Sequence, residues 1–314
     1  MNKMVKGGIF TSVGRHLEKL SSGLKLKPKW NVVTAVGEVS QMLEVPKTLE
    51  KPPYWKTGVP PPSPETPELK TAEQLRNLRS SCSLAFSILQ HLESFVKVDM
   101  TTDEIDREVH RMCLENDAYP SPLNYSGFPK SCCTSVNNIA CHGIPDSRKL
   151  QDGDIINIDI TVYKNGMHGD CSRMYKIGYV DDGGSKLCDV TYEAVERAVH
   201  ICGPGVPYYK IGEEIEKFVE SKGLTVIPCF IGHGIGSYFH GPPDIYHHKF
   251  EEAKLLGNMT PGVAFTIEPA VGEGKKDIVI LEDGWTACTL DDSRAAQSEL
   301  TVFINSQGVE VLTK

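Results

Sequence analysis

The sequence lacks the features that would place it in several common classes. No apolar run approaches the roughly 20 residues that a membrane-spanning helix needs. The cysteines include no CxxC pair and no regular spacing, which is typical of reduced thiols rather than of a disulfide framework. The HExxH, P-loop and GxSxG patterns are absent as well. Membrane-spanning, disulfide-stapled, zincin and GxSxG-hydrolase classes therefore find no support.

Composition and charge indicate an ordinary globular protein. The 314 residues are 40% hydrophobic and 24% charged, which fits one large domain or two of average size. A net charge of −8 argues against a role in coating nucleic acid. We expect no nucleic-acid or membrane partner. We also expect a monomer.

Positive charge is concentrated at the N-terminus. Residues 1–30 hold seven Lys and Arg against Glu18 alone, a surplus of six, so the remainder carries −14. A basic, acid-poor segment with Ser and Thr is typical of an organellar transit peptide, although the basic tail of a cytosolic protein has the same composition. We interpret residues 1–45 as a basic N-terminal segment with a transit-peptide role. A mitochondrial location is expected, with a cytoplasmic one as the alternative.

Proline dominates the next stretch. Eight of the twenty prolines fall between Pro46 and Pro67, in PKTLEKPPYWKTGVPPPSPETP, which excludes a helix interior and favours an extended polyproline-type conformation. This Pro-rich segment, residues 46–67, fits a linker or a strap laid across the folded domain better than a ligand for an SH3-like partner. The folded domain is therefore expected to begin near Glu68 and to cover residues 68–314.

Hydrophobic periodicity predicts helices in two groups, each followed by strands. Apolar residues recur every three or four positions from Leu75 to Leu92, and Thr101 with Glu104 forms a capping box that starts a second helix. Two more helices are expected at residues 185–202 and 209–222. Strand-like runs occur at 154–163, 167–177, 225–230, 263–268, 277–290 and 298–305. This repeated order predicts two related halves around a shared sheet.

A predicted hairpin brings two carboxylates together. Apolar and polar residues alternate from Ile156 to Val162, and Asn165-Gly166 is the preferred two-residue type I′ turn. Counting outward from the turn places Thr161 opposite Asp170, with Asp159 diagonal to Asp170 on the same face. Such neighbours lie about 7 Å apart. Two buried carboxylates at this distance would bind cations, whereas two solvated carboxylates on an exposed hairpin would have no such role.

Three further residues extend this candidate set. His233 is flanked by glycines in FIGHGIGSYFHGPP, Glu268 ends the strand AFTIEPA, and Glu299 lies in AAQSELTVFI. A loop histidine is often satisfied by hydrogen bonds, and a single buried Glu often pairs with Lys or Arg. An Asp/Asp/His/Glu/Glu set, however, suits Mn, Fe, Co or Zn in a two-metal site. His247 and His248 are expected at the surface of a polar loop.

With these residues the chain resembles the type I methionine aminopeptidases of the pita-bread metallopeptidase group. The resemblance covers about residues 70–314 and rests on the order and spacing of all five candidate ligands, together with CHGIPD at 141–146 and GHGIGSYFH at 232–240. The TTDEID, AYPSPLNY and GFPKSCCTSVNN stretches are most similar to the mitochondrial one-D branch. The resemblance implies residues 68–314 form a metallopeptidase catalytic domain. Its expected fold is the α+β pita-bread (creatinase/aminopeptidase) fold, with two pseudo-symmetric halves and a central antiparallel sheet covered by helices.

The resemblance also implies a role for each site residue. Initiator methionine would be removed from the N-terminus of nascent polypeptides by a metal-bound hydroxide at two divalent ions, Co, Mn, Fe or Zn. The implied metal ligands are Asp159, Asp170, His233, Glu268 and Glu299. The implied catalytic residues are His142, which contacts the substrate amine or scissile amide, His240, which stabilises the tetrahedral intermediate, and Glu268, which relays a proton. The implied methionine pocket is lined by Tyr125, Phe128, Cys133, Phe239 and Trp285, together with His142 and His240.

Two departures from the family pattern accompany the resemblance. Leu300 stands where family members commonly carry His, and Cys171-Ser172-Arg173 replaces the usual Thr-Ser-Glu sequence. Strand alternation predicts that the side chains of Leu300 and Arg173 face away from the metal ligands.

Two alternative functions are retained. Aminopeptidase P and prolidase share the five-ligand pattern and form the enzymatic alternative. A non-enzymatic binding protein with the pita-bread fold is the other alternative, although such proteins lose ligands and this chain keeps all five.

Overall fold

The computed structural model describes residues 3–4 and 30–314 of the chain. Most of the segment to which a transit-peptide role was assigned, residues 5–29 with residues 1 and 2, lies outside the described residues. The α-helices are α2 (Ala72–Phe95), α3 (Thr102–Glu115), α4 (Asp182–Ile201) and α5 (Tyr209–Ser221), and the short 3₁₀ turns are η1 (Tyr125–Gly127) and η2 (Glu251–Leu256). All four predicted helices are present. No helix in the described part of the chain has the length and apolarity needed to cross a membrane.

The strands are short apart from one long hairpin. In the first half of the chain they are β1 (Lys3–Met4), β2 (Tyr119–Pro120), β3 (Cys133–Val136), β4 (Ile139–Cys141), β5 (Ile155–Lys164) and β6 (Met167–Lys176). In the second half they are β7 (Thr225–Val226), β8 (Phe230–Gly234), β9 (Gly241–Ile245), β10 (Ala264–Ile267), β11 (Ala270–Gly272), β12 (Ile278–Ile280), β13 (Ala287–Thr289), β14 (Ala295–Gln297), β15 (Leu300–Ile304) and β16 (Val309–Val311). The expected strand at 277–290 is thus a β12–β13 hairpin, and the one at 225–230 is divided between β7 and the start of β8.

The first half is built on the β5–β6 hairpin. Its register is the predicted one, with Lys164 opposite Met167 and Thr161 opposite Asp170. The helix α2 begins at a complete capping box formed by Thr71 and Gln74 and packs on this hairpin. Gly169 permits the close approach, because a Cβ there would lie 2.3 Å from the backbone nitrogen of Cys82.

The second half repeats the arrangement of a helix pair over antiparallel strands. The central ladder joins β8, β10, β15 and β16, with β9 on β8 and β1 also paired to β8. An isolated antiparallel bridge between Ser172 of β6 and Glu299 joins the two halves. The hydroxyl of Thr301 on β15 adds a hydrogen bond to the carbonyl oxygen of Asp170 on β6, at 2.7 Å.

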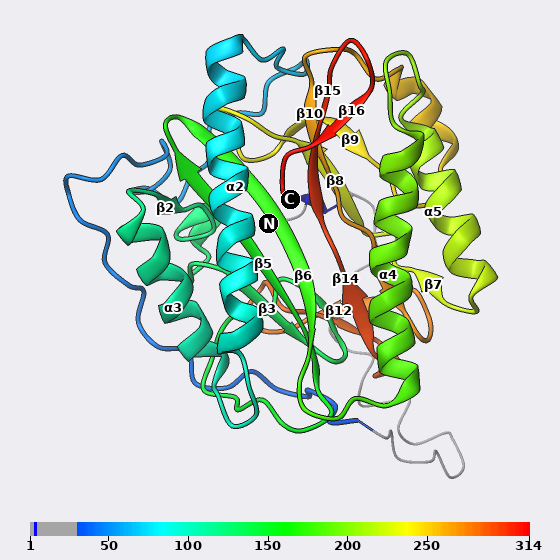
Figure 1. The fold of residues 1–314 in the computed structure, drawn as a ribbon. Coiled ribbons are helices and arrows are strands. Elements are labelled where there is room, and N and C mark those ends of the chain that lie inside the picture. Colours follow the sequence, from blue (N-terminus) through cyan, green and yellow to red (C-terminus); the bar gives the residue numbers. More distant parts are fainter. Residues whose placement is uncertain (1–2, 5–29) are drawn as a thin grey trace.

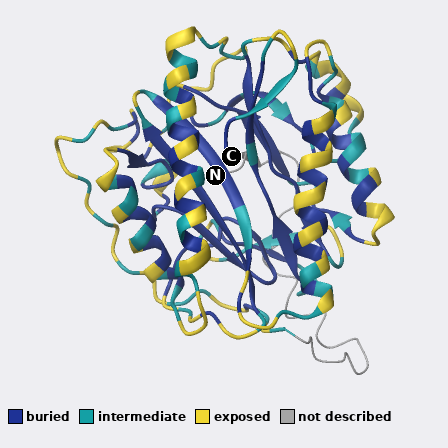
Figure 2. Cartoon of the chain, viewed as in Figure 1, coloured by how far each residue is buried: buried dark blue, intermediate teal, exposed yellow. Residues whose placement is uncertain are grey.

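Helices cover one side of the strands, as Figure 1 shows, with α2 and α4 in front and α3 and α5 at the two outer sides. Figure 2 shows that the strands are buried along most of their length, whereas the helices alternate buried and exposed faces. One apolar core lies under α2 and α3 and a second under α4 and α5. The junction between the halves therefore carries the polar groups that the two apolar cores leave out.

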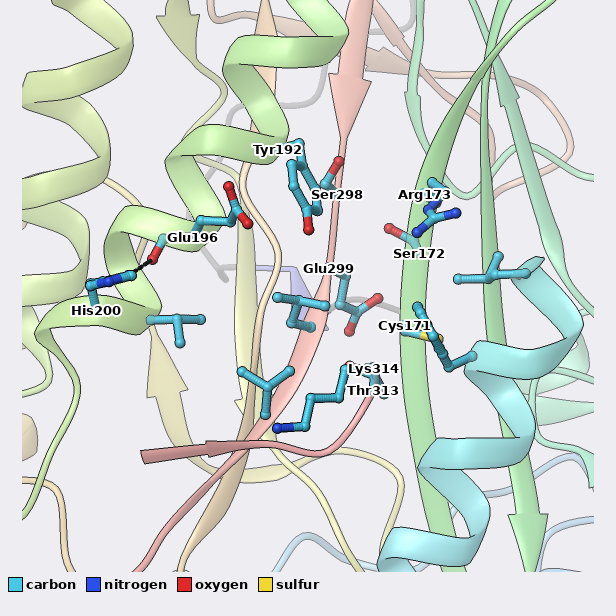
Figure 3. A pocket seen from close by; sticks show the side chains of 15 residues that line it. Cys171, Ser172, Arg173, Tyr192, Glu196, His200, Ser298, Glu299, Thr313 and Lys314 are labelled. Atoms are coloured by element: carbon cyan, nitrogen blue, oxygen red, sulfur yellow. Dashed lines mark hydrogen bonds between the residues drawn. The ribbon is translucent and has the colours of Figure 1, made fainter. Parts of the chain in front are cut away.

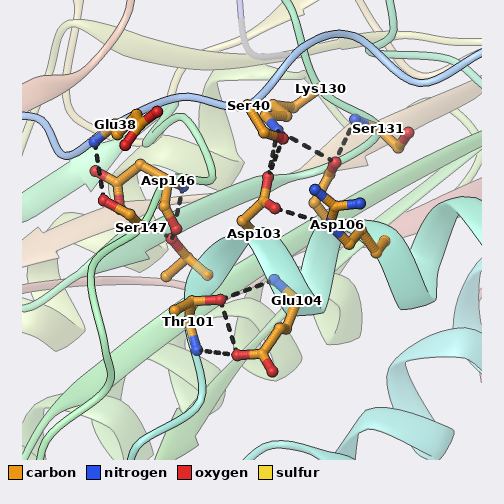
Figure 4. A network of polar contacts seen from close by, with 12 residues as sticks. Glu38, Ser40, Thr101, Asp103, Glu104, Asp106, Lys130, Ser131, Asp146 and Ser147 are labelled. Atoms are coloured by element: carbon orange, nitrogen blue, oxygen red, sulfur yellow. Dashed lines mark hydrogen bonds and ion pairs between the residues drawn. The ribbon is translucent and has the colours of Figure 1, made fainter.

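Residues 30–45 lie against the domain rather than apart from it. The backbone of Val33 exchanges hydrogen bonds with the side chain of Asn138, at 2.7 and 3.0 Å. Figure 4 shows the next attachment, where Ser40 and the buried Lys130 both reach Asp103 on α3. Trp30, the first residue of this described stretch, contacts Arg294, so residues 30–45 pack against residues of the predicted catalytic domain.

The Pro-rich segment forms a strap across the same domain. Tyr54 is 2% exposed, and its hydroxyl donates to the carbonyl oxygen of Ser121 at 2.7 Å. At the end of the strap the Glu68 carboxylate accepts hydrogen bonds from the backbone and hydroxyl of Ser237. These contacts lay the Pro-rich segment along residues 121 and 237 of the domain.

Candidate metal centre

The β5–β6 hairpin places Asp159 and Asp170 at the junction of the two halves. Asp159 is 3% exposed and Asp170 is 1% exposed; Thr301 and Glu299 of the second half lie against β6 beside Asp170. Thr161 donates a hydrogen bond to Oδ1 of Asp170 at 2.7 Å. The interpretation of two solvated carboxylates on an exposed hairpin is therefore wrong for these residues.

His233 reaches the same point from β8. Its Nε2 lies 3.8 Å from Oδ2 of Asp170 and 3.5 Å from Oε1 of Glu268. The following glycine is required by close backbone packing, since a Cβ on Gly234 would lie 1.7 Å from the carbonyl oxygen of Pro242. On the other side of His233, a Cβ on Gly232 would lie 2.3 Å from the carbonyl oxygen of Thr266, so the two glycines permit the close approach of β9 and of β10 to the histidine-bearing strand.

Glu268 and Glu299 lie at breaks between strands. Glu268 follows β10, and Glu299 lies between β14 and β15. Thr266 donates to Oε1 of Glu268 at 2.5 Å, and the side-chain amide of Gln297 lies 3.3 Å from Oε2. Among the described residues, neither carboxylate oxygen of Glu299 has a hydrogen-bond partner. The expected alternative, a pairing with Lys or Arg, is not formed by either glutamate in the part of the chain described.

The site concentrates negative charge in a buried space. One ligand atom from each of Asp170, His233 and Glu299 lies within 4.8 Å of the others. Burial, followed by repulsion from neighbouring carboxylates, raises the pKa of Glu299 well above its usual range. The pKa of Asp170 is raised by burial and by the Asp159 charge. Buried carboxylate oxygens with no partner and one imidazole are the donor set that a divalent transition-metal ion requires, so the residues fit such an ion.

Two further histidines border this cluster. His142 has a left-handed backbone, φ 58°, and burial lowers its pKa to about 3. The His240 ring lies 4.3 Å from that of His233, and its Nδ1 is 2.8 Å from the hydroxyl of Tyr125. Within the described chain the Nε2 atoms of His142 and His240 are buried and have no hydrogen-bond partner. Both rings are thus neutral and hold a polar atom ready for a ligand.

The predicted methionine-pocket residues gather in one cluster beside these histidines. Phe128, Cys133 and Phe239 belong to a single buried apolar group, with Tyr125 and Trp285 packed against it. The ring of Trp285 is edge-on to Phe128 at 5.3 Å and to His142 at 6.3 Å. Cys133 pairs with Asp159 across the β3–β5 ladder. The structure therefore brings every predicted site residue to one location.

His247 is a residue that the sequence analysis placed wrongly. It was expected at the surface, but its side chain is completely buried and its Nε2 accepts a hydrogen bond from the backbone N–H of Glu268, at 3.1 Å. The adjacent His248 is half-buried, with its ring near Tyr246 and Phe250. The polar residues around both histidines do not indicate which of the two side chains is buried.

Leu300 and Arg173 lie on the helix-covered side of the site. Figure 3 shows the cavity of about 310 Å³ between α2 and α4, to which both contribute. Arg173 pairs with Glu93 on α2, and Leu300 packs against the core under α4 and α5. These contacts match the orientation that strand alternation predicts for the two side chains, and Glu299 lines the same cavity.

Comparison with known proteins matches this architecture. The model of metallopeptidase family M24 covers residues 76–306. A methionine aminopeptidase 1D, mitochondrial, from Mus musculus is 50% identical over 90% of this chain and 83% of its own length. The crystal structure of methionine aminopeptidase from Rickettsia prowazekii matches with a TM-score of 0.77 and 36% identity, over 79% of this chain and 100% of that one. An X-Pro aminopeptidase from Thermotoga maritima matches at 20% identity and a TM-score of 0.59, over 78% of this chain and 62% of that one, which shows a common fold alone.

The chain belongs to metallopeptidase family M24, and its similarity is to the methionine aminopeptidases of that family. The expected pita-bread fold, with helix pairs over antiparallel strands in two halves, is confirmed. The expected family resemblance is confirmed as well.

Proposed function

We propose that this protein is a metal-dependent aminopeptidase that removes the N-terminal methionine of newly made polypeptides. The observation that carries the proposal is the buried set of four carboxylates and one imidazole, placed beside an apolar aromatic pocket. The similarity to methionine aminopeptidases over nine-tenths of the chain supports the same activity.

Asp159, Asp170, His233, Glu268 and Glu299 would hold two divalent ions, of Mn, Fe, Co or Zn. Bound ions of this kind polarise a carbonyl group and lower the pKa of water, which is the chemistry that peptide hydrolysis needs. The hydrogen bonds from Thr161 to Asp170 and from Thr266 to Glu268 orient the carboxylates before any ion binds.

His240 is suited to stabilise the oxyanion of the tetrahedral intermediate. Burial raises the pKa of the Tyr125 hydroxyl, so this group stays protonated and can donate to Nδ1 of His240 in the tautomer whose proton is on Nε2. Nε2 then carries the ring proton and can donate to the developing negative charge. The ring of His142 would bind the substrate amine or the scissile amide.

Glu268 is suited to relay the proton from the attacking water to the leaving amine. Burial raises its pKa well above the usual range, and the charges of neighbouring carboxylates add to this shift. A carboxyl group with a raised pKa can accept a proton and return it near neutral pH.

The methionine side chain would occupy the pocket formed by Tyr125, Phe128, Cys133, Phe239 and Trp285. A thioether packs favourably against the edges of aromatic rings. The rings of Phe128 and Trp285 lie nearly perpendicular to each other in this pocket. A small second residue would be preferred, because bulk at that position would clash beside the carboxylates.

We further propose that the enzyme acts as a monomer in mitochondria, without nucleic-acid or membrane partners. The basic composition of residues 1–30 supports this location, as does the name of the mouse relative. Residues 68–314 would form the catalytic domain, with the Pro-rich strap attached to it.

The test is hydrolysis of Met-Ala-Ser and Ala-Pro peptides by the full chain, supplied with Mn, Co, Fe or Zn. Cleavage of only the Met peptide, abolished by a chelator, is expected. Cleavage of only the Ala-Pro peptide would instead assign an aminopeptidase P activity. A folded chain that binds no metal and cleaves neither peptide would favour the binding-protein alternative.

A further inference from the structure

His247 occupies a place in the fold that the proposed catalytic roles do not explain. Its imidazole is completely buried, and Nε2 accepts the hydrogen bond from the backbone N–H of Glu268 at 3.1 Å. A backbone N–H can only donate, so Nε2 of His247 is the acceptor in this contact.

The contact fills a gap in the sheet. Pairing of β10 with β15 ends at Ile267, opposite Leu300, and pairing of β11 with β14 resumes at Ala270, opposite Gln297. Glu268 and Pro269 lie between the two ladders. Proline has no N–H, and the N–H of Glu268 has no strand partner in this gap. A buried backbone donor must be paired, and the side chain of His247 provides the acceptor.

The same gap determines the position of the Glu268 carboxylate. His247 binds the backbone on the N–H side, while the amide of Gln297 lies 3.4 Å from the carbonyl oxygen and 3.3 Å from Oε2. Two side chains thus fix the peptide units on both sides of a residue that no strand ladder holds. Loss of either would let the backbone at Glu268 rotate and move its carboxylate away from Asp170 and His233.

The strand β9 carries His247 to this position. It pairs with β8 through Ile245 opposite Gly232, so His247 follows two residues beyond the pairing. The α-helix α5 presses on the same turn, since a Cβ on Gly212 would lie 2.4 Å from the carbonyl oxygen of His248. The backbone around His247 is therefore held on two sides, and its ring is a fixed acceptor rather than a mobile one.

We propose that His247 is a positioning residue for Glu268, and through it for the divalent-metal site and the hydrolysis of the peptide bond. This inference rests on the proposed function, because it gives Glu268 its roles as a metal ligand and in proton relay. Supporting residues of this type typically change metal affinity or activity by about ten- to hundredfold when they are replaced.

The test compares His247→Phe, which keeps a buried ring but has no acceptor, with His247→Gln, whose side-chain oxygen can reach the position of Nε2. Affinity for Mn²⁺ is measured by calorimetry on the full chain after a chelator has removed its metal ions, and kcat and KM are measured with Met-Ala-Ser. The expected result for His247→Phe is Mn²⁺ affinity about ten- to hundredfold weaker, a lower kcat and a nearly unchanged KM. His247→Gln should recover most of both losses. His248→Phe and His248→Gln are the matched controls and should behave as the unmodified protein.

A folded His247→Phe variant with unchanged Mn²⁺ affinity and kcat would overturn the inference. So would equal losses in the Phe and Gln variants, because they would assign the effect to packing rather than to the hydrogen bond. If His247→Phe does not fold, His247→Asn provides the comparison with His247→Gln, since its oxygen stops short of the Nε2 position and should not restore affinity. Failure of the proposed function is distinguishable, because the unmodified chain would then bind no Mn²⁺ or cleave no Met peptide.

Discussion

Tyr54 provides a test of whether the Pro-rich strap supports the site. Its hydroxyl is bonded to the carbonyl oxygen of Ser121, and its ring is edge-on to Tyr125 at 4.9 Å and stacked near His168 at 6.2 Å. Tyr125 in turn is bonded to His240. Tyr54→Ala should therefore release the strap and remove a support of the Tyr125–His240 pair.

The magnitude follows from the contacts that are lost. Replacing a buried aromatic ring by Ala costs about 3–5 kcal/mol, and the lost hydrogen bond adds about 1 kcal/mol. The other contacts of this part of the strap, among them the hydrogen bond from the side chain of Asn124 to the carbonyl oxygen of Trp55 and the packing of Leu49, lie outside the two large apolar cores. Most of the loss should therefore appear as local opening of the strap, with an open fraction raised about a thousandfold for a change of about 4 kcal/mol. Tyr54→Phe, which loses the hydrogen bond alone, should raise it about threefold to tenfold.

Trypsin cleavage after Lys56 measures this opening, because the cleavage rate follows the open population when closing is fast. The order of cleavage rates should be Tyr54→Ala, then Tyr54→Phe, then the unmodified chain. Trp55→Ala is the matched control, since Trp55 is 40% exposed, and it should leave the rate close to that of the unmodified chain. The kcat for Met-Ala-Ser should follow the reverse order, with the lowest value for Tyr54→Ala and the highest for the unmodified chain. Cleavage of Tyr54→Ala at the unmodified rate would refute the idea that Tyr54 holds the strap.

Three further predictions concern the metal centre. Asp170→Asn should abolish turnover without unfolding the protein, because the amide can still accept the hydrogen bond from Thr161 but carries no charge; retained activity would remove Asp170 from the mechanism. His142→Ala should lower kcat far more than it lowers the metal content measured by atomic emission, and an equal loss of both would make His142 a ligand. Chelated protein should lose thermal stability as the pH rises from about 4 to neutral, because the raised pKa of Asp170 means that the folded state holds a proton the unfolded chain releases. Mn²⁺ should remove most of this loss, whereas pH-independent unfolding of the chelator-treated protein would show that burial and the Asp159 charge do not raise the pKa of Asp170.

Local chemistry made the hairpin predictable from the sequence. The Asn165-Gly166 turn fixes its own geometry, with φ of 51° and 75° at the two residues, and this determines the register of both strands. The position of Asp159 relative to Asp170 follows from that register by counting. The capping boxes at the starts of α2 and α3 are local in the same way.

Other parts of the site depend on contacts between distant segments. His247 has the same polar neighbours as His248, and only the break between β10 and β11 gives it a buried donor to bind. The composition of the strap predicts an extended chain. It does not predict where Tyr54 packs, because the surface that receives its ring is formed by residues 121–125 and 168. Tertiary packing decides which residues fill a gap in a sheet. The pattern of one sequence segment therefore does not predict them.

The central claim is that the buried acidic cluster binds divalent ions and that these ions are required for methionyl aminopeptidase activity. The most direct measurement is a Mn²⁺ titration of the chelated full chain, in which bound metal and the initial rate of Met-Ala-Ser hydrolysis are followed together, alongside Asp170→Asn. We expect the rate to rise and saturate as the ions bind, and the variant to gain no activity. A rate that is already full in the chelated protein, or that Mn²⁺ raises equally in Asp170→Asn, would contradict the claim.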